Sequence, residues 1–290
     1  MFCLIVDKFG VEYVGKQHTD HLAMVHKKNQ NITEDWTGKK YAGIDLTQEY
    51  NNRTCRSTVD GYIQQLRQKY DHPNPNNPKL SPHVHRPIEY GANPQISTPE
   101  DTSNTLDTKG INRLQVIFVV LQYVAREVKN KLLVDLSTIG IHQATATENA
   151  NTAITQLLDY VATYPDDGIL FRASGMVLAA HAYAGFLNGT KARSRSGAHI
   201  FLTEYVATPP LNGENLTIAK IIKPVIASAS EAELAALYLT AKTMVTIRNK
   251  LEEMGWLQPK SPIQIDNYTA AGFTNNTIIN KAIKTLDIKL

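Results

Sequence analysis

SEAELAALYLTAKTMVTIRNKLEEMGW, residues 230–256, predicts a long amphipathic helix, and strands are expected on both sides of it. Three stretches before the helix read as strands; they cover 176–187, 197–207 and 216–228. After the helix, PIQIDNYTAA (262–271) predicts a short buried strand that ends in an acid, and 276–290 predicts a final helix. The order β-β-β-α-β-α is typical of a mixed sheet covered by helices, and so of the α/β (α+β) class.

The upstream half predicts three further segments. Residues 1–71 are expected to contain a β-hairpin at 2–15 with DKFG as its turn, a helix at 18–28, two strands around a turn at Thr37-Gly38, and a helix at 58–70. Residues 72–110 hold most of the prolines and predict an irregular linker. Residues 111–168 have apolar residues at helical spacing and predict a helical block; its helices cover 111–128, 131–143 and 147–164.

Composition narrows the class of protein. Among 290 residues, 30 basic side chains face 27 acidic ones, a balance that neither requires nor excludes nucleic acid. Cys3 and Cys55 are too few for a disulfide framework and lack metal-ligand spacing, which favours a reducing compartment. The first residues lack the features of a signal peptide, and the apolar run at 116–125 is too short to span a bilayer. We therefore expect an intracellular protein, cytoplasmic or nuclear, with no membrane partner.

Three acids of the last segment are candidates for metal binding. Glu233 lies near the start of the long helix, Asp266 lies where a buried strand meets a loop, and Asp287 lies on the final helix. Acids at strand ends and on facing helices can converge on two divalent cations, which activate water and stabilise a leaving oxygen in phosphodiester cleavage. Two structural alternatives stay open: Glu231 and Glu233 could be the solvent and capping acids of a helix start, and Asp266 could form an Asx turn.

Several motifs of the chain occur in the same order in one known family. ASASEAELAAL (227–237), followed by PIQIDNYTA (262–270), resembles the ribonuclease H domain of copia-type retrotransposon polyproteins, with its Ser-x-x-Glu-Ala-Glu helix start and its Asp-Asn strand end. KARSRSGAHIFL (191–202) is similar to the family's Arg-Lys-Ser-x-Ser-Gly-Tyr hairpin. Further motifs resemble the connection segment and the end of the reverse transcriptase palm; they are LLDYVATYPDDGILF (157–171), YVGKQHTDHL (13–22), EDWTGKKYAGIDLTQEY (34–50) and VDGYIQQLRQKYDH (59–72). The agreement in order over nearly the whole chain makes the resemblance specific.

The resemblance implies a domain plan and an activity. It identifies 1–71 as the C-terminal part of a reverse transcriptase palm, 72–110 as a linker, 111–168 as a helical thumb or connection, and 169–290 as a ribonuclease-H-like domain. The family's activity is RNA-directed DNA synthesis and cleavage of the RNA strand of RNA–DNA hybrids, with two Mg²⁺ ions as cofactor. The implied partners are nucleic acid and the remainder of a polyprotein.

Two departures from the family bear on activity. FCLIVDKFGVEYVG (2–15) resembles the hairpin that carries paired aspartates, but here it reads Asp7-Lys8, and an ammonium beside a divalent ion is repulsive. With the third palm carboxylate also missing, we expect no polymerisation by this chain alone. The family's Ser-Asp-Ala segment aligns Tyr183 with a catalytic acid, and a phenol is a poor metal ligand at neutral pH. The resemblance implies that Glu233 and Asp266 remain as catalytic acids, and it matches Asp287 to the fourth acid.

Other candidate ligands come from basic and histidine residues. Lys191, Arg193 and Arg195 alternate before a strand and could contact the phosphates of a hybrid duplex, or could form a solvated hairpin. His181 shares a strand face with Tyr183 and could point into the site, although a satisfied core or surface histidine is the alternative. Two histidine pairs, His83 with His85 and His18 with His21, could bind zinc; a surface linker and a polar helix face are the alternatives.

Three hypotheses for function compete. The chain could be a surviving ribonuclease H, a catalytically dead remnant that still binds nucleic acid, or a decayed reading frame. Tyr183 and Lys8 favour the second and third. We therefore predict no hybrid cleavage in magnesium.

Overall fold

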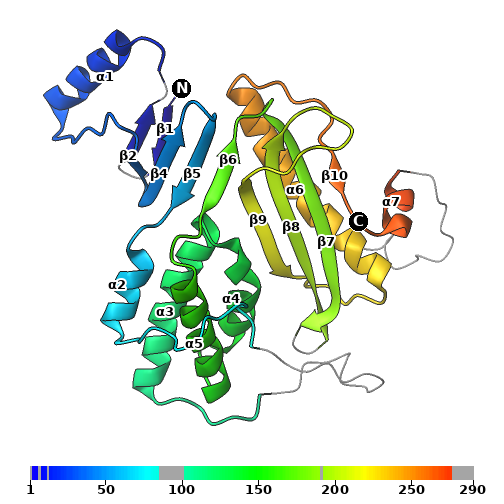
Figure 1. The fold of residues 1–290 in the computed structure, drawn as a ribbon. Coiled ribbons are helices and arrows are strands. Elements are labelled where there is room, and N and C mark those ends of the chain that lie inside the picture. The colour runs from blue at the N-terminus through cyan, green and yellow to red at the C-terminus, as the bar shows by residue number, and fades with distance from the viewer. Residues whose placement is uncertain (1, 6–7, 12, 85–100, 190–191, 276–290) are drawn as a thin grey trace.

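The computed structural model describes residues 2–5, 8–11, 13–84, 101–189 and 192–275 (Figure 1). The mixed α/β class expected from the sequence is confirmed. A helical block lies below an N-terminal sheet, and a C-terminal sheet stands beside both (Figure 1). No helix in the described part of the chain combines the length and the apolar character needed to cross a membrane.

The C-terminal sheet has the predicted mixed order. Strands β7 (Val177–Gly189), β8 (Arg193–Thr203) and β9 (Glu214–Ile221) are antiparallel neighbours. Helix α6 (Ala229–Glu253) then crosses one face, and β10 (Ile263–Gln264) returns parallel to β7, which gives the order β10-β7-β8-β9. The face under α6 is apolar, since Leu178, Ala180 and Ala182 of β7 pack in one buried cluster with Met244 and Leu251 of α6.

The last part of this segment differs from the prediction. The expected strand at 262–271 is only two residues long, and α7 (Tyr268–Thr274) follows it directly. The reason is a helix cap: the Asn267 side chain accepts a hydrogen bond from Ala270 N at 3.0 Å, so the backbone turns into a helix. The helix expected at 276–290 lies outside the described residues.

The N-terminal sheet brings together strands from two distant parts of the chain. Its order is β3 (Lys40–Tyr41), β4 (Ile44–Glu49), β5 (Thr54–Thr58) and β6 (Ile169–Arg172), all antiparallel. The sequence did not predict β5 or β6, and it assigned residues 169–172 to the last segment. Because β6 pairs with β5, these residues complete the N-terminal sheet instead.

Two turns differ from their expected places. The first hairpin is confirmed, with β1 (Phe2–Ile5) antiparallel to β2 (Lys8–Val11), but residues 8–10 of the expected DKFG turn belong to β2. In the second hairpin, the turn lies at Ala42-Gly43 rather than at Thr37-Gly38. Both turn residues have positive φ, 51° and 89°, and a Cβ on Gly43 would come within 2.8 Å of the Tyr123 hydroxyl. Glycine therefore suits position 43 for two reasons: it adopts positive φ without strain, and its lack of a Cβ lets the hairpin approach Tyr123 of α3.

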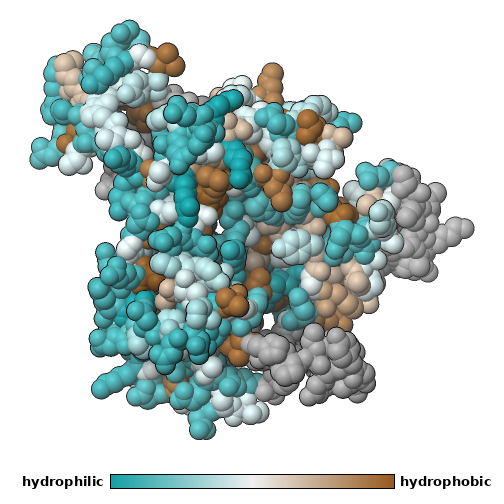
Figure 2. Space-filling model, in the orientation of Figure 1, coloured by the Kyte–Doolittle hydropathy of each residue, from teal (hydrophilic) through white to brown (hydrophobic). Residues whose placement is uncertain are grey.

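The helical block has the largest buried core. It contains α2 (Tyr62–Lys69), α3 (Thr108–Glu127), α4 (Leu133–Ile139), which is flanked by short 3-10 turns at Asn130–Leu132 and Gly140–His142, and α5 (Glu148–Thr163). One apolar cluster joins all four helices, and Asp107 and Thr147 cap α3 and α5 with their side chains. The outward face of the block is mostly hydrophilic (Figure 2). By contrast, α1 (Lys16–Asn29) has no buried residue and extends away from the body (Figure 1).

Candidate carboxylate site

Two of the predicted acids come together beside the C-terminal end of β10. The pairing of β10 with β7 ends at Gln264 and His181. Ala180 N donates to Pro262 O at 3.0 Å, so the amide of Ala184, four residues on in the same strand, also points toward the β10 side. Glu233 of α6 fills this position, since its Oε1 accepts from Ala184 N at 2.9 Å. We call Glu233 and Asp266 at this point the carboxylate site.

Glu233 is unusual among the acids because it is buried and only one of its two carboxylate oxygens accepts a hydrogen bond from a described residue. The residue is 7% exposed, and its Oε2 is buried with no hydrogen-bond partner within the described residues. Burial raises the pKa of Glu233, the Ala184 amide opposes that rise, and the nearby charge of Asp266 adds to it. An orphaned carboxylate oxygen of this kind needs a proton or a cation, because an uncompensated buried charge is costly.

The structure separates Glu233 from its neighbour Glu231. The Ser228 hydroxyl accepts from Glu231 N at 3.2 Å, and Glu231 Oε2 accepts from Ala227 N at 2.7 Å. This pair resembles a capping box, with the Glu231 carboxylate accepting from the residue before the N-cap, so Glu231 has the structural role that the sequence left open for both acids. Glu233 is not part of the cap.

Asp266 lies at a bend between β10 and α7 and is exposed. It is close enough for its charge to act on the pKa of Glu233. The adjacent Asn267, rather than Asp266, caps α7. Asp266 therefore has no capping role there, and its carboxylate can act with Glu233.

Tyr183 and His181 lie on the other face of the sheet. Ala182 and Ala184 pack under α6, and because neighbours in a strand point to opposite faces, residues 181 and 183 point away from it. The Tyr183 ring covers Gly197 of β8, where an added Cβ would lie 2.6 Å from it. His181 packs edge-on against Phe201, with ring centroids 5.4 Å apart, and burial together with the nearby His199 lowers the pKa of His181. His181 thus makes a packing contact rather than pointing at Glu233.

The basic residues Lys191, Arg193 and Arg195, predicted to face one way, do not share one environment. Arg195 is only 8% exposed; its Nη1 donates to Val134 O at 3.0 Å and its Nη2 to Thr138 Oγ1 at 3.1 Å, both in α4. Arg195 therefore joins β8 to the helical block and does not face solvent. Arg193 is exposed, and Lys191 lies outside the described residues.

The remaining candidates are the two histidine pairs and the residues of the expected palm hairpin. His83 Nδ1 lies 2.6 Å from Asp135 Oδ1, so the linker is held to α4 at this point, while its expected partner His85 lies outside the described residues. His18 and His21 are exposed on α1. Within the described ranges, no group of three or more His, Cys, Asp or Glu side chains is placed to hold a metal ion. Asp7 and Asp287 lie outside those ranges, and Lys8 is described only as the first residue of β2.

Sequence reasoning missed the group that orients Glu233 and the groups that hold Arg195 away from solvent. The Ala184 amide orients Glu233, but it is a backbone group, and no side-chain pattern in the sequence marks it. It is free to bind Glu233 because β10 pairs with β7 only as far as Gln264. The α4 groups that hold Arg195 are a backbone carbonyl and a hydroxyl far away in the sequence. The Ser228-x-x-Glu231 spacing was a usable signal for the cap.

Comparison of the chain with protein-family models, with curated proteins and with solved structures found no match. The residues of the carboxylate site therefore carry the functional argument.

The raised pKa of Glu233 predicts a pH-dependent effect of Glu233→Gln. The folded protein holds the Glu233 proton above the ordinary pKa of 4.5, so wild-type stability falls as pH rises from 4.5 through the raised value. Glutamine stays neutral, so the Tm of the variant minus that of wild type should increase from pH 4 to pH 7. Thermal unfolding at pH 4, 5.5 and 7 measures this difference. Glu253→Gln, on the exposed end of the same helix, should show little pH-dependent change; a pH-independent difference for Glu233→Gln would contradict the prediction.

Proposed function

We propose that this chain is the C-terminal part of a reverse transcriptase together with the ribonuclease H domain of a copia-type retrotransposon polyprotein, and that its hybrid cleavage in magnesium is lost. The observation that carries the proposal is the carboxylate site. A buried glutamate with an orphaned oxygen lies beside an aspartate at the end of a parallel strand, and both acids stand in the motifs of the resemblance.

The carboxylate site fits part of a magnesium centre. Carboxylate oxygens are the donors that Mg²⁺ prefers, and Glu233 has one such oxygen without a partner. Glu233 and Asp266 would hold the ion, with Asp287 as the further acid implied by the resemblance. A divalent ion there supplies activation of water and stabilisation of the leaving oxygen. The chain itself keeps Glu233 ionisable and oriented through the Ala184 amide.

The set of acids is incomplete, which is the reason for expecting lost cleavage. The position aligned with the family's first-strand acid holds Tyr183, and its ring covers Gly197 rather than Glu233. Fewer carboxylates mean weaker binding of the metal and less stabilisation of the transition state. We also propose that this chain alone does not synthesise DNA, because Lys8 stands where the family has a second palm aspartate.

An RNA–DNA hybrid cleavage assay tests the proposal. Wild type in excess Mg²⁺ is expected to cleave no faster than Glu233→Gln. A thermal-shift titration with Mg²⁺ provides a second readout: wild type should be stabilised and Glu233→Gln should not, while Glu253→Gln should behave as wild type. Tyr183→Asp restores the carboxylate implied by the resemblance, but it should leave the shift unchanged, because residue 183 points to the face of the sheet opposite Glu233.

Two results would overturn parts of the proposal. Strong cleavage by wild type that disappears in Glu233→Gln or Asp266→Asn would refute the loss of activity. Equal Mg²⁺ shifts in wild type and Glu233→Gln would remove the carboxylate site as a metal site.

Binding without cleavage is a second candidate. It is favoured by the exposed Arg193 at the start of β8. Affinity for a hybrid duplex should fall between two salt concentrations, because contacts to phosphates release counterions. Absence of salt-dependent affinity would exclude this candidate.

A further inference from the structure

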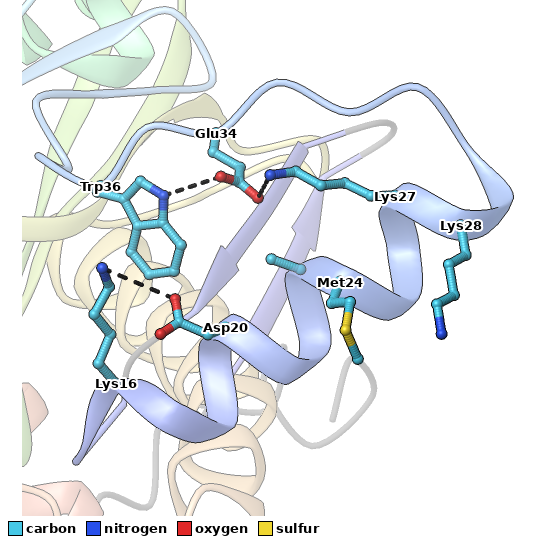
Figure 3. Close-up of a pocket in the computed structure, with 8 residues that line it drawn as sticks. Lys16, Asp20, Met24, Lys27, Lys28, Glu34 and Trp36 are labelled. Carbon is cyan, nitrogen blue, oxygen red and sulfur yellow. Dashed lines mark hydrogen bonds and ion pairs between the residues drawn. The ribbon is translucent and has the colours of Figure 1, made fainter.

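A cavity beside α1 has one aromatic wall, Trp36, and the chain's own Lys16 lies over that ring. A cavity of about 530 Å³ lies between α1 and residues 34–36, and its walls include Trp36, Asp20 and Met24. The Lys16 ammonium lies 4.8 Å from the centre of the Trp36 ring, and its Nζ is 3.9 Å from Asp20 Oδ1. Figure 3 shows Lys16 and Asp20 reaching from the same helix toward the indole.

The indole is held in place on two sides. The Tyr13 ring meets it edge-on at 84°, with centroids 6.2 Å apart. Trp36 Nε1 donates to Glu34 Oε2 at 3.1 Å, and Lys27 Nζ lies 2.9 Å from Glu34 Oε1. Hydrogen bonds from Lys27 and Trp36 lower the pKa of Glu34, so this carboxylate is charged at neutral pH. An oriented aromatic face with carboxylates beside it attracts organic cations.

We propose that Trp36 and Asp20 form a binding site for an alkylammonium group of another molecule, and that Lys16 occupies the site when the ligand is absent. Lys16 can leave at little cost, because its side chain is 64% exposed and a surface ion pair contributes little. Once it leaves, Asp20 is unpaired and the indole face is open. The ligand chemistry is a quaternary or methylated ammonium, free or on a lysine side chain. This proposal does not depend on the carboxylate site.

The sign of the Lys16 effect separates this site from a nucleic-acid platform. If bases stacked on Trp36 and Lys16 contacted phosphate, removal of Lys16 would weaken binding. If Lys16 competes with a bound cation, its removal strengthens binding. Lys28 provides the matched control, because it lines the same cavity but extends from α1 away from Trp36 (Figure 3).

Trp36 fluorescence in the full chain, with Trp256→Phe to remove the other tryptophan signal, provides the assay. The probes are tetramethylammonium chloride and a peptide with one trimethyl-lysine, each titrated beside the unmethylated peptide. Lys16→Gln should bind the methylated probes about two- to fivefold more tightly than the parent. Lys28→Gln should change affinity less than about twofold, since exposed charges are screened in 0.15 M salt. Preference for the peptide over the free ion identifies a lysine side chain as the source.

Trp36→Leu removes the fluorescent ring, so its binding is measured by calorimetry. Binding of the probes should be abolished, while the circular dichroism spectrum, which reports the fold, should stay unchanged. The proposal is overturned if Lys16→Gln binds no more tightly than Lys28→Gln, or if Trp36→Leu binds as well as its parent. It is also overturned if a single-stranded oligonucleotide binds the parent and Lys16→Gln weakens that binding while neither methylated probe binds.

Discussion

Arg195→Met is expected to lower the free energy of unfolding by about 2–4 kcal/mol, because it removes buried hydrogen bonds from a charged donor while keeping an apolar stem. The guanidinium donates to Val134 O and to Thr138 Oγ1 and joins β8 to α4. Burial raises the pKa of the half-buried Asp135, and the charges of His83 and Arg195 oppose that rise, so loss of Arg195 leaves that carboxylate less well compensated. Urea denaturation followed by far-UV circular dichroism measures the change.

Arg193→Met is the matched control, because it makes the same substitution two residues earlier, at an exposed position. It should change the free energy of unfolding by less than about 0.5 kcal/mol. If hybrid affinity depends on this strand, Arg193→Met should weaken it, whereas Arg195→Met should act through stability. Equal stability losses in the two variants would contradict the assignment of Arg195 to the α4 contact.

The fold was predictable from the sequence where local periodicity carries the information. The 230–256 pattern predicted α6, and Ser228 with Glu231 marked its start. Strands β5 and β6 were missed because both are short and each is stabilised by a partner far away in the chain. The second half of the expected 262–271 strand became α7, because an asparagine cap overrode the apolar pattern.

The site was predictable in part for a similar reason. Motif spacing selected Glu233 and Asp266, and the structure brings them within electrostatic reach. The Ser228-x-x-Glu231 spacing could have assigned the cap to Glu231, but the sequence did not show that Glu233, in the next turn, would be buried against the Ala184 amide. The prediction that Arg195 contacts phosphates rested on strand alternation. Alternation shows which face of the sheet a side chain lies on, but it does not show that α4 covers that face.

Leu66→Ala is expected to lower the free energy of unfolding by about 2–5 kcal/mol, because a leucine that is 5% exposed leaves a cavity in a close-packed core. Leu66 belongs to α2, within the segment expected to be palm, yet it shares one buried cluster with Leu114 of α3 and Leu157 of α5. Urea unfolding and amide exchange of α5 measure the effect.

If the two segments unfold together, Leu66→Ala should lower the protection of the α5 amides as much as that of α2. Met24→Ala on α1, where the side chain is 46% exposed, should leave both unchanged within about 0.5 kcal/mol. Because the shared cluster gives α2 no separate core, the helical block should lose its protection in one step. Loss of protection confined to α2 would show instead that the palm segment and the helical block are independent folding units.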